Sequence, residues 1–418
     1  MAWIGILHIS FLGVLGWLFA KKYKNTDWFW IGIGAFTIKM IALYFFVWIH
    51  QNYYTHYQPD FKLIFEDASH LTNIFYKSPN EYVQILIDKH FFSKNWHLSN
   101  QPRAFFTVKI YSFLTIFTFS NFWLTAIYSS LLALWGMWYL THTLIQLFPE
   151  TKKAAIIAFL FLPSCIFWAS ATSKESILLF LISLIISNFF QLIHFEKKRS
   201  NSYLKSIFIL LFLIVLWKVK YYYAFGLSIS LILYIFLHYT KKYKLVTWKK
   251  SLLFCFVTFG GVLLSFLHPN IQINALPEAL YNNYLLIIKA SPKNSIVELG
   301  LEPTWLSILQ NSPKALYLGL FSPMPWDSQN WQMILVSIEN VLLMSLLILG
   351  IRKFIQKKYT QTLDSNFLMM LFVYIFIMAV FLALSSPNFG ALSRYRCGFS
   401  PFLWYVVFLQ FLKSKTQV

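Results

Sequence analysis

The chain has 418 residues, of which 58% are hydrophobic and only 12% are charged. A water-soluble protein cannot bury that much apolar surface, so the composition excludes a soluble globular protein and indicates an integral membrane protein. The formal net charge is +20, but the basic residues cluster beside apolar runs, as they do in cytoplasmic loops, so nucleic acid is not the expected partner.

Apolar runs of roughly membrane-spanning length repeat along the chain. A helix needs about 20 residues to cross the hydrocarbon core, and backbone groups in lipid must satisfy one another, so each run predicts a helix. The sequence therefore predicts an all-α polytopic protein with about 11–12 transmembrane helices, in a single transmembrane domain covering 1–418. The predicted spans are 2–20, 28–49, 122–147, 153–171, 176–195, 204–217, 221–240, 250–268, 331–351, 366–386 and 399–412, with 104–119 as a twelfth candidate.

Basic clusters set the predicted topology. Lys21, Lys22 and Lys24 follow the first span, which predicts an uncleaved anchor with its N-terminus outside. The clusters placed in the cytoplasm are Lys21–Lys24, Lys152–Lys153, Lys197–Lys205, Lys241–Lys250, Arg352–Lys358 and Lys413–Lys415. If 50–103 lies outside, 104–119 cannot be a complete crossing; either it is a re-entrant or surface-lying helix, or one span boundary is misplaced.

The opposite face receives two long loops, 50–103 and 269–330, and three short turns, 169–175, 217–223 and 386–398. The long loops hold most of the acidic residues and are rich in Trp, Tyr, Pro and Asn, so we expect short helices lying on the membrane surface over a cavity. The three cysteines share no metal-binding spacing and predict no disulfide framework.

The first candidate site is the segment HYQPDFKLIFEDASHL, 56–71. Apolar residues recur there at helical spacing and predict an amphipathic interfacial helix over 60–76, with Asp60 at its start and Glu66 and Asp67 on another face. Asp60 either caps this helix or serves as a general base that activates an acceptor hydroxyl near the membrane surface.

Two further candidates lie in short outer turns. In FLPSCIFWASATSKES, 161–176, Lys174 and Glu175 open a helix, where the lysine either binds a phosphate or pairs with its neighbour at the membrane boundary. In WKVKYYYAF, 217–225, Lys218 and Lys220 lie on the face where the topology rule disfavours positive charge, and two cations there predict an anion.

The last two candidates lie near the C-terminus. In SSPNFGALSRYRCGFSP, 385–401, Arg394 and Arg396 sit in irregular backbone, and the planar guanidinium suits phosphate oxygens. Asp327 precedes the span that contains Glu339, and an acid inside a membrane helix predicts either a functional group or a structural partner for Lys39. Together these turns predict a site that binds a lipid phosphate on the outer face.

These segments resemble the GT-C superfamily of polyprenyl-phosphate-dependent glycosyltransferases, especially bacterial relatives of protein O-mannosyltransferases and aminoarabinose transferases. Members carry a catalytic Asp in the first large outer loop, soon after a membrane helix, and Asp60 in PDFKLIFEDASHL matches that position. The segments LPSCIFWASATSKES, SPMPWDSQNW and SRYRCGFSP are similar to stretches in bacterial proteins of this kind.

The resemblance implies an inverting transfer of a sugar from polyprenyl phosphate to a hydroxyl on a protein, lipid or glycan, outside the bacterial inner membrane. Asp60 would be the base, and the departing phosphate would be stabilised by five cations, Lys174, Lys218, Lys220, Arg394 and Arg396. The supporting acids would be Glu66, Asp67, Glu175, Asp327 and Glu339. No cofactor is required; some members use a divalent metal, which Glu66 or Asp67 would help to hold.

Three other functions compete with this interpretation. A polysaccharide polymerase or ligase would use lipid-diphosphate glycans and would give the loop 269–330 the main role. A lipid or glycan transporter would place charged residues on both sides of the midplane and show an internal repeat. A structural subunit of a membrane assembly would need no convergent charge.

Overall fold

A computed structural model describes residues 2–52, 58–88, 96–195, 199–242, 272–327, 331–356 and 363–412. In these ranges the regular elements are helices, and one isolated backbone bridge joins Ile296 to Asn388. The predicted all-α fold is therefore confirmed. The helices cluster into two compact units: unit 1 comprises Met1–Thr143 and Leu160–Lys220, and unit 2 comprises Leu144–Phe159 and Tyr221–Val418.

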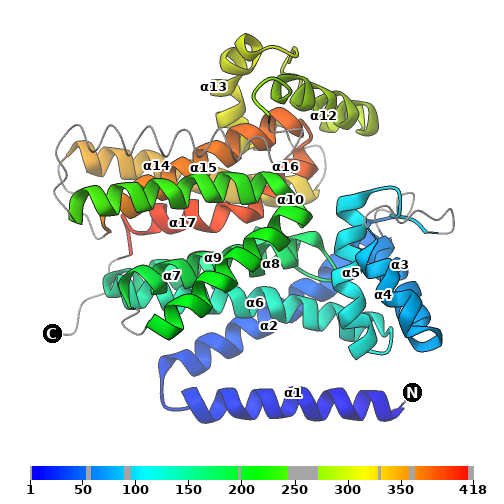
Figure 1. Cartoon of the computed structure of the whole chain (residues 1–418). Helices are drawn as coiled ribbons and strands as arrows, with labels where there is room; N and C mark the ends of the chain where they lie inside the picture. Colours follow the sequence, from blue (N-terminus) through cyan, green and yellow to red (C-terminus); the bar gives the residue numbers. More distant parts are fainter. Residues whose placement is uncertain are drawn as a thin grey trace. The chain divides into compact units, whose positions relative to one another are not determined.

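Unit 1 holds the N-terminal helices (Figure 1). They are α1 (Ala2–Tyr23), α2 (Asp27–Asn52), α3 (Asp60–Lys77), α4 (Pro79–Ile87), α5 (Pro102–Phe117), most of α6 (Phe122–Leu147), α8 (Pro163–Trp168) and α9 (Lys174–His194). The long helix α10 (Arg199–Lys242) begins in unit 1 and continues into unit 2. Its regular geometry is interrupted at Lys220, where φ is −149° and ψ is 84°.

The amphipathic helix predicted over 60–76 is confirmed as α3, and its position at the membrane interface stays a prediction. Phe61, Ile64, Ala68 and Leu71 are all buried, as their helical spacing predicts. The apolar face of α3 packs chiefly against α5 and also against α4 (Figure 1). Because α3 is held by these two helices, its first turn has a defined place within unit 1.

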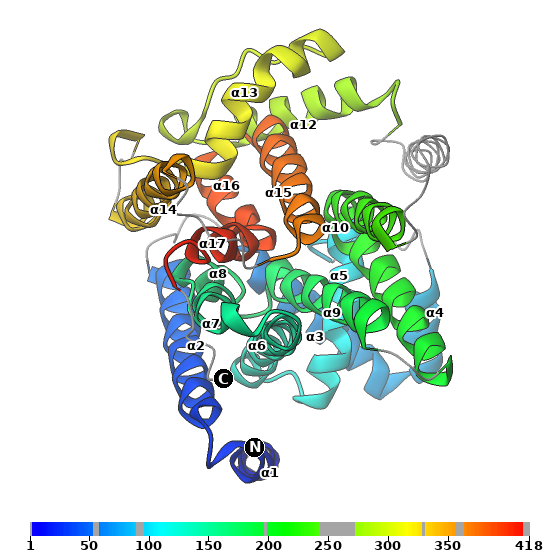
Figure 2. The ribbon, with the colours of Figure 1, turned by 90° about the vertical axis from the view of Figure 1, so that its left-hand side faces the viewer.

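Unit 2 contains the rest of the described chain (Figure 2). Its helices are α7 (Lys152–Leu160), α12 (Leu276–Ala290), α13 (Trp305–Phe321), α14 (Trp331–Ile355), α15 (Ser365–Ser385), α16 (Phe389–Tyr395) and α17 (Ser400–Phe408). Single helical turns occur at η1 (Pro149–Thr151), η3 (Lys293–Ser295), η4 (Pro325–Asp327) and η5 (Arg396–Gly398). The helices α12 and α13 confirm that the loop 269–330 contains short helices, and both pack against α15.

Among the described residues, six helices are long and apolar enough to cross a membrane, or up to seven if a bent pair counts as one span. They are Trp3–Tyr23, Asp27–Asn52, Lys174–His194, Ser202–Lys241, Trp331–Lys353 and Ser365–Ser385. The protein is therefore a multi-pass membrane protein by helix length and hydropathy. This number is below the 11–12 spans expected from the apolar runs.

Local features explain much of the difference. The predicted span 153–171 is interrupted after Leu160, where Pro163 opens a new short helix and leaves α7 and α8 as separate pieces. The predicted spans 204–217 and 221–240 form one kinked helix, α10. The last predicted span is only nine residues long as α17. The predicted span 250–268 lies outside the described residues.

The doubtful run 104–119 corresponds to α5. This helix has 16 residues and meets α6 at an angle of 116°, so the pair is a broken span or a re-entrant loop. The sharp bend is made by Phe119 and Ser120, which both adopt the left-handed conformation, with φ values of 52° and 55°. The sequence could not place 104–119 as a complete crossing, and the structure shows a sharp bend between α5 and α6 at the end of this run.

Candidate functional site

Asp60 is the first residue of α3. The capping position is occupied by Pro59, and no side chain caps this helix end. Asp60 is therefore not the capping residue, and its carboxylate in the first turn interacts favourably with the helix dipole. The Asp60 side chain is half-buried, which is compatible with contact to a substrate.

Aromatic rings surround the residue that follows Asp60. The Phe61 side chain is only 4% exposed and packs against Phe46 and His50 of α2, with ring centroids 5.2 and 5.4 Å away. Trp168, the last residue of α8, lies 6.3 Å from Phe46 by the same measure. The His50 ring donates from Nδ1 to the Phe46 carbonyl at 2.7 Å, because a carbonyl can only accept.

The loop 169–173, which joins α8 to α9, meets the start of α3. Thr172 Oγ1 donates to the Phe61 carbonyl at 2.7 Å, linking two residues that are 111 positions apart. Phe61 is next to Asp60 in the chain, and Thr172 is two residues before Lys174. The structure thus brings two of the predicted site segments together within unit 1.

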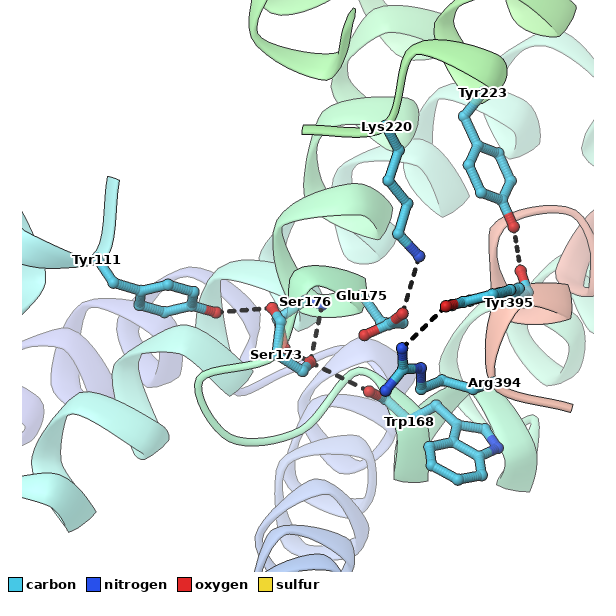
Figure 3. A network of polar contacts seen from close by, with 9 residues as sticks. All are labelled: Tyr111, Trp168, Ser173, Glu175, Ser176, Lys220, Tyr223, Arg394 and Tyr395. Atoms are coloured by element: carbon cyan, nitrogen blue, oxygen red, sulfur yellow. Dashed lines mark hydrogen bonds and ion pairs between the residues drawn. The ribbon is translucent and has the colours of Figure 1, made fainter. Parts of the chain in front are cut away.

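Several helices hold the loop 169–173 in place. Ala171 adopts a left-handed conformation with φ 57°, and its amide donates to Ser130 Oγ of α6 at 3.2 Å. Tyr111 of α5 donates to the Ser173 carbonyl at 2.8 Å, and Ser173 caps α9 by accepting from the Ser176 amide (Figure 3). Each of these side chains is buried, so the loop conformation is determined by the surrounding helices.

A buried lysine supports the beginning of the same loop. Lys39 of α2 is 1% exposed, and its Nζ donates to the carbonyls of Ile166 and Ala169 at 2.9 and 2.7 Å. These carbonyls lie at the C-terminal end of α8, where no further turn of helix supplies donors. The sequence suggested Glu339 as a partner for Lys39; that pairing stays a prediction, whereas the two carbonyl contacts are observed.

Lys174 and Glu175 open α9 but differ in burial. Lys174 is half-buried, whereas Glu175 is 3% exposed and forms an ion pair with Lys220 at 2.8 Å (Figure 3). Lys220 is therefore matched by an acid of the same chain, at the irregular point of α10. Lys218, two residues earlier, is exposed. The sequence predicted an anion close to Lys218 and Lys220. For Lys220, the structure shows the Glu175 carboxylate in that place.

Asp67 does not lie where the sequence pattern placed it. It was expected to face away from the apolar side of α3, but it is fully buried on that side. Its two carboxylate oxygens accept from the amides of His97 and Leu98 at 3.1 and 2.8 Å. These bonds compensate for burial of the charge and fasten the chain before α5 to α3. Glu66 is on the more exposed side, 3.3 Å from the His97 ring and 3.9 Å from Lys62.

Metal binding by these acids was left open by the sequence. Within the described ranges, no group of three or more His, Cys, Asp or Glu side chains is arranged to hold a metal ion. Both Asp67 oxygens already accept backbone hydrogen bonds, so this residue fits a structural role better than that of a metal ligand. The residues around Asp67 therefore do not fit a metal centre built on Glu66 and Asp67.

In unit 2, Arg396 is a buried structural residue, 6% exposed. Its guanidinium donates to Asn340 Oδ1 at 2.6 Å, to the Leu320 carbonyl at 3.2 Å and to the Ser322 carbonyl. It therefore ties the end of α13 to the middle of α14. These three bonds use Nη1 and Nη2 of the guanidinium. The assignment of Arg396 to a phosphate stays a prediction.

Arg394 lies in a more open position than Arg396. It is half-buried, stacks over the ring of Tyr395 at 4.9 Å and donates to the Tyr395 hydroxyl at 3.1 Å. The Tyr395 carbonyl in turn accepts from the hydroxyl of Tyr223 (Figure 3). Nearby, Asn388 caps α16 and donates to Ser291 and Ser295, which fixes the segment before Arg394.

The remaining two candidate acids are also in unit 2. Asp327 accepts from the Met324 amide at 2.9 Å and so stabilises its own turn, η4. Glu339 is half-buried in the third turn of α14.

In unit 1, the hydrogen bond from Thr172 to Phe61 therefore links the segment of Asp60 to the segment of Lys174, and Glu175 pairs with Lys220. Arg394 and Arg396 lie in unit 2. Sequence reasoning missed Thr172 and Tyr111 as site-forming residues, because single hydroxyl side chains carry no local signal. No family model, curated protein or solved structure matches this chain.

Proposed function

We propose that the protein is a membrane glycosyltransferase that moves a sugar from a polyprenyl-phosphate donor to an acceptor hydroxyl, with its catalytic groups in unit 1. The observation that carries the proposal is the hydrogen bond from Thr172 to the Phe61 carbonyl. It brings the first turn of α3, with Asp60, next to the loop that leads to Lys174. A carboxylate beside a cation at a membrane boundary suits the activation of a hydroxyl near a lipid phosphate.

The reaction needs two chemical groups from the chain. Asp60 accepts the proton of the acceptor hydroxyl while that oxygen attacks the anomeric carbon of the sugar. The bond between the anomeric carbon and the phosphate oxygen breaks, its electron pair leaves with the polyprenyl phosphate, and the sugar configuration inverts. Lys174 neutralises the negative charge that develops on the phosphate, which makes it a better leaving group.

Burial and position distinguish Lys174 from the other predicted phosphate ligands. Lys220 and Arg396 are buried, whereas Lys174 and Arg394 are half-buried and can be reached from outside the protein. Of these two, Lys174 follows the loop that contacts the first turn of α3. Lys174 is therefore assigned to the phosphate, because it belongs to the same unit as Asp60.

The test uses the full-length protein in liposomes with radiolabelled polyprenyl-phosphate sugars of several kinds. Wild-type protein should release polyprenyl phosphate with at least one of them. Asp60→Asn should lower the turnover number by about 100-fold or more, because loss of a general base typically costs that factor. Asp88→Asn serves as the control, since Asp88 is an exposed acid of the same outer segment and should leave turnover within about twofold.

Three results would contradict the proposal. Full activity of Asp60→Asn would remove the base. Turnover only with lipid-diphosphate glycans, and not with lipid monophosphates, would favour the polymerase or ligase. Movement of intact lipid-linked sugar across the bilayer without bond cleavage would favour a transporter.

A further inference from the structure

We propose that Lys39 is a positioning residue that holds the loop 169–173 against the first turn of α3. The inference rests on the proposed function only in the sense that the site it serves is that of Asp60 and Lys174. Lys39 is 1% exposed in the middle of α2, and its Nζ donates to two backbone carbonyls at the end of α8. Because the side chain is buried and contacts the backbone there, its proposed role is to shape the backbone.

The need for a cation at this point follows from the helix end. The α8 helix has only six residues, so the carbonyls of Ile166 and Ala169 lack donors from a further turn. In an apolar environment backbone carbonyls and a lysine inside a membrane helix all need hydrogen-bond partners. Lys39 donates to both carbonyls, and Ser170 Oγ also donates to the Ile166 carbonyl at 2.8 Å. Ser176 of α9 also donates to the Ala169 carbonyl at 2.8 Å, so two helices hold the same atom.

The consequence reaches Asp60 through four loop residues. From Ala169 the chain passes through the left-handed Ala171, which is an uncommon conformation for a residue with a side chain and must be held by its surroundings. It then reaches Thr172, which donates to the Phe61 carbonyl next to Asp60. Without Lys39 the Ala169 carbonyl loses its bond to α2 and keeps its bond to Ser176 of α9. The start of the loop is then held less firmly, so the spacing between Asp60 and Lys174 can change.

The chain contains a matched control in the same unit. Lys109 of α5 donates to the carbonyls of Leu86 and Asp88 at 3.2 and 2.6 Å, at the C-terminal end of α4. Lys109 therefore donates to carbonyls at the end of α4, as Lys39 donates to carbonyls at the end of α8. No contact described here connects Lys109 with the loop 169–173. Replacing either lysine by Met removes the cation and keeps an unbranched side chain of similar length.

The first measurement needs no substrate. Cys165 is 1% exposed in α8 and adjoins Ile166, so its reaction rate with N-ethylmaleimide reports opening at the end of α8. In a background with Cys255→Ser and Cys397→Ser, Lys39→Met should label about tenfold faster than the parent protein. Lys109→Met and Lys39→Arg should both stay within about twofold of the parent. All variants are first checked for a single symmetric peak in gel filtration.

The second measurement uses the transfer assay. Lys39→Met should lower the turnover number about tenfold with little change in the KM for the lipid donor, because misplacement of catalytic groups affects the transition state more than binding. Lys39→Arg should recover most of the turnover, and Lys109→Met should keep it. A protein that had merely lost stability would lose active molecules without this rescue pattern.

The two measurements separate the two proposals. Equal labelling of Cys165 in Lys39→Met, Lys109→Met and the parent would overturn the role of Lys39, and so would labelling of Lys39→Arg as fast as that of Lys39→Met. If wild-type protein transfers no sugar, the proposed function fails, while the labelling rates still decide whether Lys39 holds the loop.

Discussion

One lysine–carboxylate pair from each unit can be compared, because the distances between nitrogen and oxygen are almost the same. Lys220 and Glu175 in unit 1 are 2.8 Å apart, and Lys241 and Asp364 in unit 2 are 3.0 Å apart. Their side chains differ in exposure: 5% and 3% in the first pair, 70% and 30% in the second. Distance therefore does not distinguish the pairs, whereas burial does, because water screens the exposed charges and not the buried ones.

Burial thus identifies the cations of this protein that stabilise its fold. Buried cations are matched inside the chain: Lys220 by Glu175, Lys39 by two carbonyls and Arg396 by three oxygens. A predicted anion-binding residue that proves to be deeply buried is thus more readily explained by folding than by a ligand. Lys174 and Arg394 differ from these three cations in being only half-buried.

The largest expected effect is on the buried pair. Glu175→Gln leaves Lys220 charged and without its carboxylate, and breaking a buried pair in this way costs about 3–5 kcal/mol. We expect a marked fall in the temperature at which half of the detergent-purified protein stays monodisperse in gel filtration. The double variant Glu175→Met with Lys220→Met removes both charges and should recover most of the loss. A double variant as unstable as the single one would show that packing, and not charge, explains the effect.

An intermediate effect is expected for the buried arginine of unit 2. Arg396→Met leaves no buried charge behind, but it removes donors from Leu320, Ser322 and Asn340, and the expected loss is about 2 kcal/mol. The same thermal assay measures it. Arg394→Met is the matched control, because Arg394 is the other arginine of this segment and is only half-buried. If the two variants lose equal stability, burial does not determine how much each arginine contributes to stability.

The smallest effect is expected for the exposed pair. Asp364→Asn should change stability by about 0.2–1 kcal/mol, and the change should shrink further in high salt, because exposed ion pairs are screened. Thermal assays at low and high ionic strength measure this difference. A loss as large as that of Glu175→Gln would contradict the link between burial and energy on which the comparison rests.

Much of the fold could be predicted because its signals are local. Long apolar runs produced α1, α2, α9, α14 and α15 close to their expected bounds. The helical spacing of apolar residues after Asp60 predicted the buried face of α3. The errors also have local causes, since a hydropathy pattern does not show that α5 and α6 meet at a sharp bend or that α7 and α8 are separate.

The side-chain partners could not be predicted in the same way. Asp67 was assigned to the wrong face because a charged residue is expected to point away from an apolar stripe, and the two amides that compensate its burial lie 30 and 31 residues away. Lys39 finds the Ala169 carbonyl across 130 residues, and Tyr111 finds Ser173 across 62. No periodicity within a helix contains this information.

Composition, hydropathy and helical period alone determined that this is an all-α protein that crosses a membrane several times, because these properties act within a few turns of chain. Only the tertiary structure decided that Lys220 pairs with Glu175, that Lys39 supports the end of α8, and that Thr172 lies against the first turn of α3. The physical reason is that a buried polar group must find a partner, and that partner can lie anywhere along the chain.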